Sequence, residues 1–176
     1  PNIAESDIDE TIETEILICG AGHAGLTAAM VASEKGAKVV ILEKNPSPAL
    51  YKMYLGAVNS TAQIASGAQI DKNEIVNEMV RYGSGHVNQK LIKVWADESG
   101  ETLDWLAGLL AKHDATHVAE TDNGTGYHGI FKIYPIHTRF VTKDLKYPQT
   151  NSIIVEEATK KGAQFRFNTP MVKLIR

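Results

Sequence analysis

The chain has 176 residues, a formal net charge of −3, and hydrophobic and aromatic fractions of 43% and 7%. These values are typical of a soluble globular protein, and the interspersed charges argue against nucleic-acid binding. No apolar run is long enough to predict a membrane span. Because the chain begins with Pro1 rather than methionine, we expect that it has been trimmed, and a cytoplasmic or an exported location stays open.

Residues 1–13 are acidic and low in apolar content, which predicts an N-terminal arm. An apolar run then covers 16–19, a glycine-rich turn 20–25 and a small-residue helix pattern about 23–35, before a second apolar run at 39–42. This order of strand, turn, helix and strand predicts a dinucleotide-binding βαβ unit. An ordinary glycine turn in another βα fold is the alternative.

Each glycine of the turn has a predicted task. Gly20 permits the tight turn, Gly22 lets a pyrophosphate approach the backbone, and Gly25 lets the helix pack closely on the strand. Unpaired N–H groups at the helix start then hold a phosphate. Glu43 ends the second strand 23 residues after the first glycine, Gly20. There its carboxylate can accept from ribose hydroxyls and repels a 2′-phosphate, which argues against NADP.

Other residues of this stretch are less specific. His23 and Ala24 lie in the turn, and Lys44 follows the acid, so all three are expected near the dinucleotide. For His23, packing at the helix start is an equal interpretation. Cys19, the single cysteine, lies in the first strand and is interpreted as a small core residue without a redox role.

Downstream of the βαβ unit, Lys44–Gly56 is predicted to be a loop because Pro46 and Pro48 exclude helix. The small-residue segment Gly56–Ser60 has two equal interpretations. It is either a loop that enters a short helix or a second backbone approach to the same cofactor.

Helices dominate the prediction for the middle of the chain. Residues 71–74 resemble a capping box ahead of an amphipathic helix, and a second helix is predicted over Asn88–Glu98. Ser99 is predicted to cap a further helix that ends at about Lys112. The polar, glycine-rich stretch Glu120–Gly129 is predicted to be a loop.

Short strands and one helix are predicted for the C-terminal part of the chain, from residue 130 onward. Ile130–Tyr134 and Ala163–Phe167 have strand patterns, and the apolar stretch Met171–Ile175 predicts another strand. Asn151 is predicted to cap a helix that ends at Gly162.

His113 and His117 have the i, i+4 spacing of a helical metal site. The residues between them are poor helix formers, and no third ligand is placed by the sequence, so no metal site is predicted.

The fold class that follows is α/β, a Rossmann-like doubly wound parallel sheet. The first two strands and the strand at 163–167 form its core, with a long helical insertion over about 45–162. Residues 14–176 are expected to form a partial FAD/NAD(P)-binding domain. A long insertion after the glycine turn and acid is typical of FAD-dependent oxidoreductases.

The chain resembles the N-terminal part of the FAD-binding domain of the fumarate reductase/succinate dehydrogenase flavoprotein family, including its soluble fumarate- and urocanate-reductase-like members. The stretches that carry the resemblance are GAGHAGLTAA (20–29), VVILEK (39–44), LGAVNS (55–60), ESGETLDWL (98–106) and GAQFRFNTPMVKLI (162–175). They cover most of the chain and are weakest over 115–149.

The resemblance implies that the glycine turn faces the FAD pyrophosphate and that Glu43 binds the adenosine ribose. It implies further that the Gly56–Asn59 segment lines the flavin side and that the backbone of Met171 contacts adenine. The complete set of expected cofactor-binding residues is Gly20, Gly22, His23, Ala24, Gly25, Glu43, Lys44, Gly56, Ala57, Asn59 and Met171.

The chain also departs from the family pattern. Residues 46–50 (PSPAL) stand where the family has a Gly-Gly-Asn-Thr-like run, so flavin contacts there are in question. The family's histidine context for covalent attachment is not recognisable in this sequence, so we expect non-covalent FAD. The later β-meander, the Ala-Thr-Gly segment and the substrate-capping domain have no counterpart, so no catalytic residue is predicted, and the strand at Met171–Ile175 would leave an open edge that favours self-association.

The expected function is therefore the FAD-binding portion of a flavin-dependent oxidoreductase that transfers a hydride to or from a small unsaturated acid. Its catalytic and capping parts would lie outside this chain. The alternative is a nucleotide-binding fragment without redox activity of its own.

Overall fold

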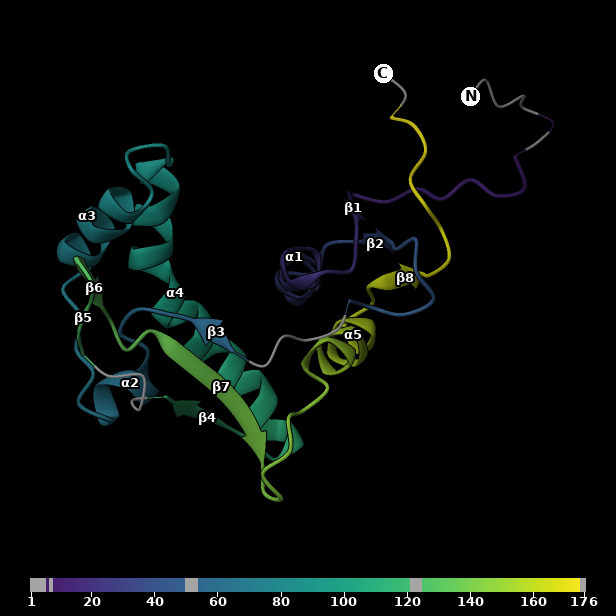
Figure 1. Cartoon of the computed structure of the whole chain (residues 1–176). Helices are drawn as coiled ribbons and strands as arrows, with labels where there is room; N and C mark the ends of the chain where they lie inside the picture. The colour runs from purple at the N-terminus through teal and green to yellow at the C-terminus, as the bar shows by residue number, and fades with distance from the viewer. Residues whose placement is uncertain (1–5, 7, 50–53, 121–124, 175–176) are drawn as a thin grey trace. The chain divides into compact units, whose positions relative to one another are not determined.

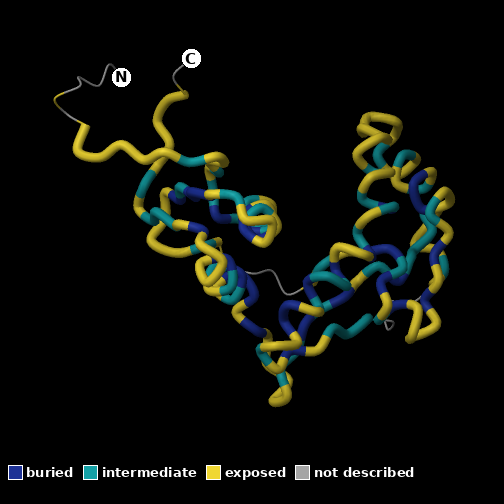
Figure 2. Tube along the Cα trace, turned by 180° about the vertical axis from the view of Figure 1, so that it is seen from behind, coloured by how far each residue is buried: buried dark blue, intermediate teal, exposed yellow. Residues whose placement is uncertain are grey.

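The computed structural model describes residues 6, 8–49, 54–120 and 125–174. The chain divides into two compact units, Pro1–Tyr51 with Gln149–Arg176, and Lys52–Pro148 (Figure 1). Each unit has its own buried positions, whereas the stretches next to the chain ends are exposed (Figure 2). No helix within the described ranges is long and apolar enough to cross a membrane.

The first unit contains the predicted parallel sheet. Its elements are β1 (Ile16–Cys19), α1 (His23–Glu34), β2 (Val39–Leu42), α5 (Thr150–Lys160) and β8 (Gln164–Arg166). The strand order is β1-β2-β8, and both pairings are parallel, with Ile18 opposite Ile41 and Ile41 opposite Phe165. The prediction of a parallel core built from these three segments is confirmed.

Helices α1 and α5 pack against each other and against this sheet (Figure 1). Leu26 and Met30 of α1 and Ile41 of β2 are fully buried, and Ile154 of α5 is nearly so. The helix α1 ends where predicted, because Gly36 adopts a positive φ of 84° that side chains rarely tolerate.

The prediction that Cys19 is a core residue is wrong, because it is exposed. β1 forms an edge of the described sheet, and side chains alternate between its two faces. Ile18 faces α1, whereas Leu17, which points the other way, is 51% exposed. The face that carries Leu17 and Cys19 is therefore left uncovered at β1 by the residues described.

Two predictions near the C-terminus are also wrong. Asn151 is not the N-cap of α5: Gln149 holds that position, and the Asn151 side chain instead donates to the carbonyl of Ala49 over 2.5 Å. The predicted strand at Met171–Ile175 is absent over 171–174, where the chain is exposed and has no strand partner among the described residues, while Ile175 lies outside them.

The second unit mixes helices and antiparallel strands, so the insertion is less helical than expected. Its helices are α2 (Thr61–Ala65), α3 (Lys72–Tyr82), α4 (Gln89–Leu110) and the short 3-10 helix η2 (Ala111–His113). Its strands are β3 (Leu55–Gly56), β4 (Ala115–Ala119), β5 (Gly126–His128), β6 (Phe131–Ile133) and β7 (His137–Thr142). β3, β7 and β4 form one antiparallel sheet in that order, and β5 and β6 form a hairpin.

Asp71 caps α3 as predicted, since its carboxylate accepts from the N–H groups of Asn73 and Glu74 at 2.8 and 2.9 Å. The two helices predicted on either side of Ser99 are one continuous helix, α4, which Asn88 caps. Ser99 caps nothing, because its hydroxyl accepts from the N–H of Val58 at 3.0 Å.

The stretch predicted as a loop at 120–129 forms β5 near its end, and residues 121–124 lie outside the described residues. The strand predicted at Ile130–Tyr134 is confirmed as β6. The core of this unit is built on Val58, Ile70, Ile75, Val76 and Ala96, against which Ile92, Trp95, Tyr134 and Ile136 pack.

Candidate functional site: the glycine turn and the acid that follows β2

The glycine turn has the geometry that its sequence predicts. Gly20 has a φ of 107°, a conformation that favours glycine. A Cβ on Gly25 would lie 2.0 Å from the carbonyl oxygen of Gly20 and 3.2 Å from Cγ2 of Ile18. The start of α1 can therefore lie against the end of β1 only because residue 25 has no side chain.

Gly22 is different, since a Cβ built there meets no atom within 4 Å. It is the N-cap residue of α1, with extended backbone and no side-chain cap, and its carbonyl accepts the first helical bond from Leu26 at 2.9 Å. His23 and the exposed Ala24 form the first turn behind it. The first N–H groups of a helix have no acceptor inside the helix, and the helix dipole makes this end positive. The open space at Gly22 is thus suited to an anionic group such as a pyrophosphate.

Glu43 is tied to this turn through its carboxylate. Oε2 accepts from the N–H of Ala21 at 2.7 Å, and Oε1 accepts from the N–H of Asn45 at 2.9 Å. The side chain is buried, yet these two bonds lower its pKa, the bond from Ala21 contributing most. Glu43 is therefore a carboxylate at neutral pH, and each oxygen keeps a lone pair for a further donor.

A hollow of about 240 Å³ lies beside this carboxylate. It is lined by Cys19, Gly20, Leu42, Glu43, Lys44, Pro170 and Met171. Backbone bonds bring the last two there, because the N–H of Thr169 donates to the carbonyl of Glu43 at 2.8 Å and that of Asn168 to the carbonyl of Asn45 at 3.0 Å. Four of the predicted cofactor-binding residues therefore surround one hollow.

Sequence reasoning missed three contributors to this arrangement, namely Ala21, Cys19 and Pro170. The position of Ala21 between two motif glycines is a usable signal, because backbone N–H groups of such turns point at anions. The sequence predicts a core position for Cys19, and nothing in it places Pro170 near β2.

The expected residues Gly56, Ala57 and Asn59 belong to the second unit, so the structure describes their surroundings only within that unit. Their polar groups serve the local fold. The carbonyl of Ala57 accepts from Nε2 of Gln63 at 2.9 Å. Asn59, which has a φ of 60°, exchanges two 2.8 Å bonds with the backbone of Ile70 through its amide.

One face of α4 holds this segment in place, which the sequence did not indicate. Nε1 of Trp95 donates to the carbonyl of Gly56 at 3.0 Å, and Ser99 accepts from Val58. A Cβ on Gly100 would lie 2.5 Å from the carbonyl oxygen of Val58. One turn on, Asp104 accepts from the backbone N–H of Thr61 at 2.9 Å. Contacts spaced along one helix face thus fix the backbone of residues 56–61.

The histidine pair is not on one helix: His113 ends η2 and His117 lies in β4. His117 stacks on Phe140 with ring centroids 4.8 Å apart, and burial lowers its pKa. In the part of the chain that the structure describes, no group of three or more His, Cys, Asp and Glu side chains could hold a metal ion.

The parallel βαβ unit, the glycine turn and the acid beside its hollow define a dinucleotide-binding domain of the Rossmann type. The sequence profile described as "FAD binding domain" matches residues 15–176. The chain therefore belongs to this family of FAD-binding domains, and FAD is its cofactor.

Relatives with curated names include the digoxin reductase of Eggerthella lenta, which is 32% identical over 138 residues, 74% of this chain and 22% of that protein. The probable fumarate reductase Ifc3 of Shewanella frigidimarina is 25% identical over 169 residues, 92% of this chain and 26% of that protein. This chain thus spans about a quarter of the length of these relatives.

The open conformation of a flavocytochrome c3 fumarate reductase is a structural neighbour with a TM-score of 0.69 and 23% identity. The likeness covers 92% of this chain and 28% of that one. A 3-ketosteroid-Δ4-(5α)-dehydrogenase from Rhodococcus jostii has a TM-score of 0.68 and 18% identity, covering 94% of this chain and 40% of that one. These two likenesses support the fold.

The residues present fit FAD on structural grounds. The space at Gly22 accepts a pyrophosphate, the packing at Gly25 brings the helix dipole to it, and the carboxylate of Glu43 lines a hollow at the end of β2. The arrangement suits the adenosine diphosphate part of the cofactor.

Proposed function

We propose that this chain is the FAD-binding portion of a flavin-dependent oxidoreductase, fumarate-reductase-like, that transfers a hydride to or from a small unsaturated acid. The observation that carries this proposal is the hollow shared by Gly20, Glu43 and Met171, next to the open helix start at Gly22. The relative named as a probable fumarate reductase supports the unsaturated acid. A further relative, from Lactiplantibacillus plantarum and 26% identical over 152 residues, is named as a vinyl phenol reductase and supports reduction of a carbon–carbon double bond.

Each group in the first unit has a task in this proposal. The N–H groups at the start of α1 bind the pyrophosphate, with His23 and Ala24 in the adjoining turn. Glu43 accepts from the ribose hydroxyls while its bond from Ala21 holds the carboxylate in place. Lys44 and the backbone of Met171 border the adenosine. Bound FAD supplies the hydride chemistry, and this chain contributes binding and orientation.

In the second unit, we propose that the backbone of Gly56, Ala57 and Asn59 lines the flavin side of the cofactor. The support is that α4 fixes this backbone through Trp95 and Ser99. Residues 14–176 would then act together as a partial FAD-binding domain with an insertion at about 45–162, preceded by an arm over 1–13. We place the catalytic and capping groups outside this chain, and none of its residues is assigned a catalytic role.

We propose further that FAD is held without a covalent bond, since the groups assigned to it act through backbone N–H groups and a carboxylate. Acid precipitation of the loaded protein tests this, because non-covalent flavin passes into the supernatant. Flavin that stays with the precipitate would contradict the proposal.

The function itself is tested by the flavin content of the purified chain and by the turnover of a longer polypeptide that contains this chain, with a reduced artificial electron donor and fumarate. Bound flavin with turnover supports the oxidoreductase. If the longer polypeptide binds flavin but shows no turnover, the alternative of a nucleotide-binding fragment without redox activity is supported. The proposal would be refuted if neither the purified chain nor the longer polypeptide bound flavin.

A further inference from the structure

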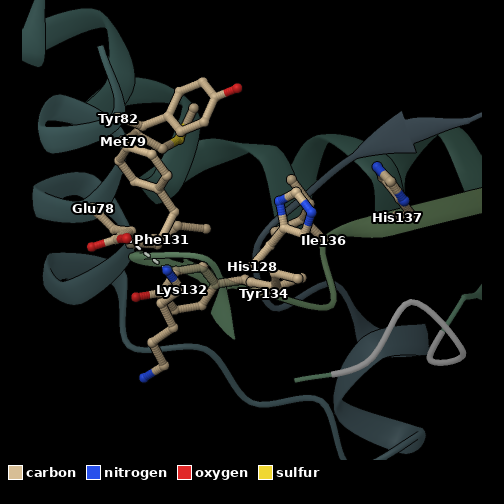
Figure 3. Close-up of a pocket in the computed structure, with 11 residues that line it drawn as sticks. Glu78, Met79, Tyr82, His128, Phe131, Lys132, Tyr134, Ile136 and His137 are labelled. Carbon is tan, nitrogen blue, oxygen red and sulfur yellow. Dashed lines mark hydrogen bonds between the residues drawn. The ribbon is translucent and has the colours of Figure 1, made fainter. Parts of the chain in front are cut away.

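The second unit contains a hollow of about 370 Å³ that the FAD proposal does not use (Figure 3). One wall is α3, through Ile75, Glu78, Met79 and Tyr82, and the other is the β5–β6 hairpin with the segment that leads to β7. This volume falls in the range of small-molecule sites, which is roughly 300–1,000 Å³.

Polar bonds fasten the hairpin to α3 along one side of the hollow. The backbone N–H of Lys132 donates to Glu78 at 2.6 Å, and the Lys132 ammonium pairs with Glu74. Arg81 pairs with Glu78 and lies 4.9 Å above the ring of Phe131. The walls are therefore fixed by contacts that do not depend on anything within the hollow.

The lining itself is apolar and aromatic. The rings of Tyr82 and Phe131 meet edge to face with centroids 4.8 Å apart, and Met79 lies beside them in Figure 3. Across the hollow in the same view, His128 lies next to Ile136. Met79 is 37% and Tyr82 70% exposed, so large apolar surfaces face the opening without cover from the described residues. Such surfaces favour a ring that stacks or packs edge-on.

The charges of the side chains around the hollow determine which polar group a bound aromatic ligand can carry. Glu78, the carboxylate that lines the hollow, forms an ion pair with Arg81 and accepts from the Lys132 N–H, and Glu74 is paired with the Lys132 ammonium. A cationic ligand would therefore find no uncommitted carboxylate. The imidazole of His128, exposed at the opposite wall, can donate to an acceptor.

We propose that this hollow binds a small aromatic acid, its ring lying between Met79, Phe131 and Ile136 and its carboxylate directed at His128. All residues of this site belong to the second unit, and none of them lines the dinucleotide hollow, so the probe can be tested in the absence of FAD. It would add an effector or auxiliary substrate site to the domain.

The test uses the whole chain with methyl-labelled methionine and 3-phenylpropionate as the probe. The Met79 signal is expected to move saturably, with a dissociation constant of about a millimolar for a molecule of this size. The signal of Met30, buried in the first unit, should stay unchanged. The amine 3-phenylpropylamine, which has the same ring and the opposite charge, should bind at least about fivefold more weakly.

Two matched variants complete the test. His128→Leu is expected to weaken 3-phenylpropionate about fivefold, since leucine has no N–H group that can donate to the carboxylate. His86→Leu, at an exposed histidine outside the hollow, should leave the affinity unchanged. The proposal is overturned if the Met79 signal does not move, if the amine binds as tightly as the acid, or if the two variants behave alike. None of these outcomes bears on FAD binding.

Discussion

The backbone N–H of Ala21 donates to Oε2 of Glu43 over 2.7 Å, so the glycine turn after β1 and the acid after β2 are directly bonded. The second oxygen of Glu43 accepts from Asn45. A residue expected to bind ribose thus also holds together the two loops that form its own site. Substitutions of Glu43 should therefore affect the stability of the fold as well as the affinity for FAD.

Glu43→Gln is predicted to destabilise the chain by about 1–3 kcal/mol, because the amide NH₂ group must replace one of two oxygens that accept from a backbone N–H. Urea unfolding at neutral pH measures the change, and FAD affinity should fall in parallel. Glu34→Gln is the control, since Glu34 is exposed and its ion pair with Lys161 is long at 3.9 Å. It should shift stability by less than about 0.5 kcal/mol. Equal effects of the two variants would contradict the role of Glu43.

The pH dependence of stability follows from the same bonds. The folded pKa of Glu43 lies below its ordinary value of 4.5, so the folded state binds fewer protons than the unfolded state in this range. The contribution is complete above pH 4.5 and is lost as the pH falls through the folded pKa. Wild type should therefore lose more stability than Glu43→Gln on going from pH 5 to lower pH, as urea unfolding at several pH values would measure. Parallel curves would exclude this contribution.

Gly25 and Gly22 should respond to alanine in different ways. Gly25→Ala places a Cβ 2.0 Å from a backbone oxygen and is predicted to cost about 1–3 kcal/mol of folding stability. Gly22→Ala meets no atom within 4 Å, so the fold should be nearly unaffected, whereas FAD affinity should fall by roughly tenfold because the methyl group occupies the path of the pyrophosphate. Thermal unfolding and flavin-fluorescence titration measure the two effects. Unchanged FAD affinity in a folded Gly22→Ala protein would argue against this phosphate site.

A second glycine pair lies on α4. Gly100→Ala brings a Cβ 2.5 Å from the carbonyl of Val58 and 2.9 Å from that of Asn59, which is predicted to destabilise the second unit by about 1–3 kcal/mol. Gly108→Ala on the same helix meets nothing within 4 Å and should stabilise by about 0.5–1 kcal/mol, since alanine is the better helix former. Hydrogen exchange and thermal unfolding would detect the opposite signs. A neutral Gly100→Ala would mean that α4 does not fix the 56–61 backbone closely.

We propose that the chain self-associates, and the structure changes the surface through which we expect this to occur. The strand expected at Met171–Ile175 is absent over the described residues 171–174, whereas β1 is an edge of the described sheet and exposes Leu17. We predict that the chain associates through β1 and that Leu17→Lys lowers the association measured by sedimentation equilibrium. Leu145→Lys, at a 79% exposed position in the second unit, is the control. Association that is the same in both variants would remove β1 from consideration.

The sequence by itself determined the βαβ unit and the tasks of its glycines. These signals are local: an apolar strand, a turn that needs residues without side chains, a helix ended by Gly36 and a strand ended by Glu43. Each depends on residues a few positions apart, so the order of residue types is sufficient to predict them. The pairing of the strand at 163–167 followed from the same fold rules.

Only the tertiary structure decided the rest. Serine and asparagine are good helix caps by residue type, yet Ser99 and Asn151 both lie inside helices. The Ser99 hydroxyl accepts from the distant backbone N–H of Val58, and the Asn151 side chain donates to the distant carbonyl of Ala49. Its place in a strand predicts a buried Cys19, but Cys19 is exposed, because the burial of a strand residue depends on which elements pack on its face of the sheet. Met171 reaches the hollow beside Glu43 only through backbone bonds formed after β8 pairs with β2. Contacts between residues far apart in the chain carry no local signal, and they set the final arrangement of this site.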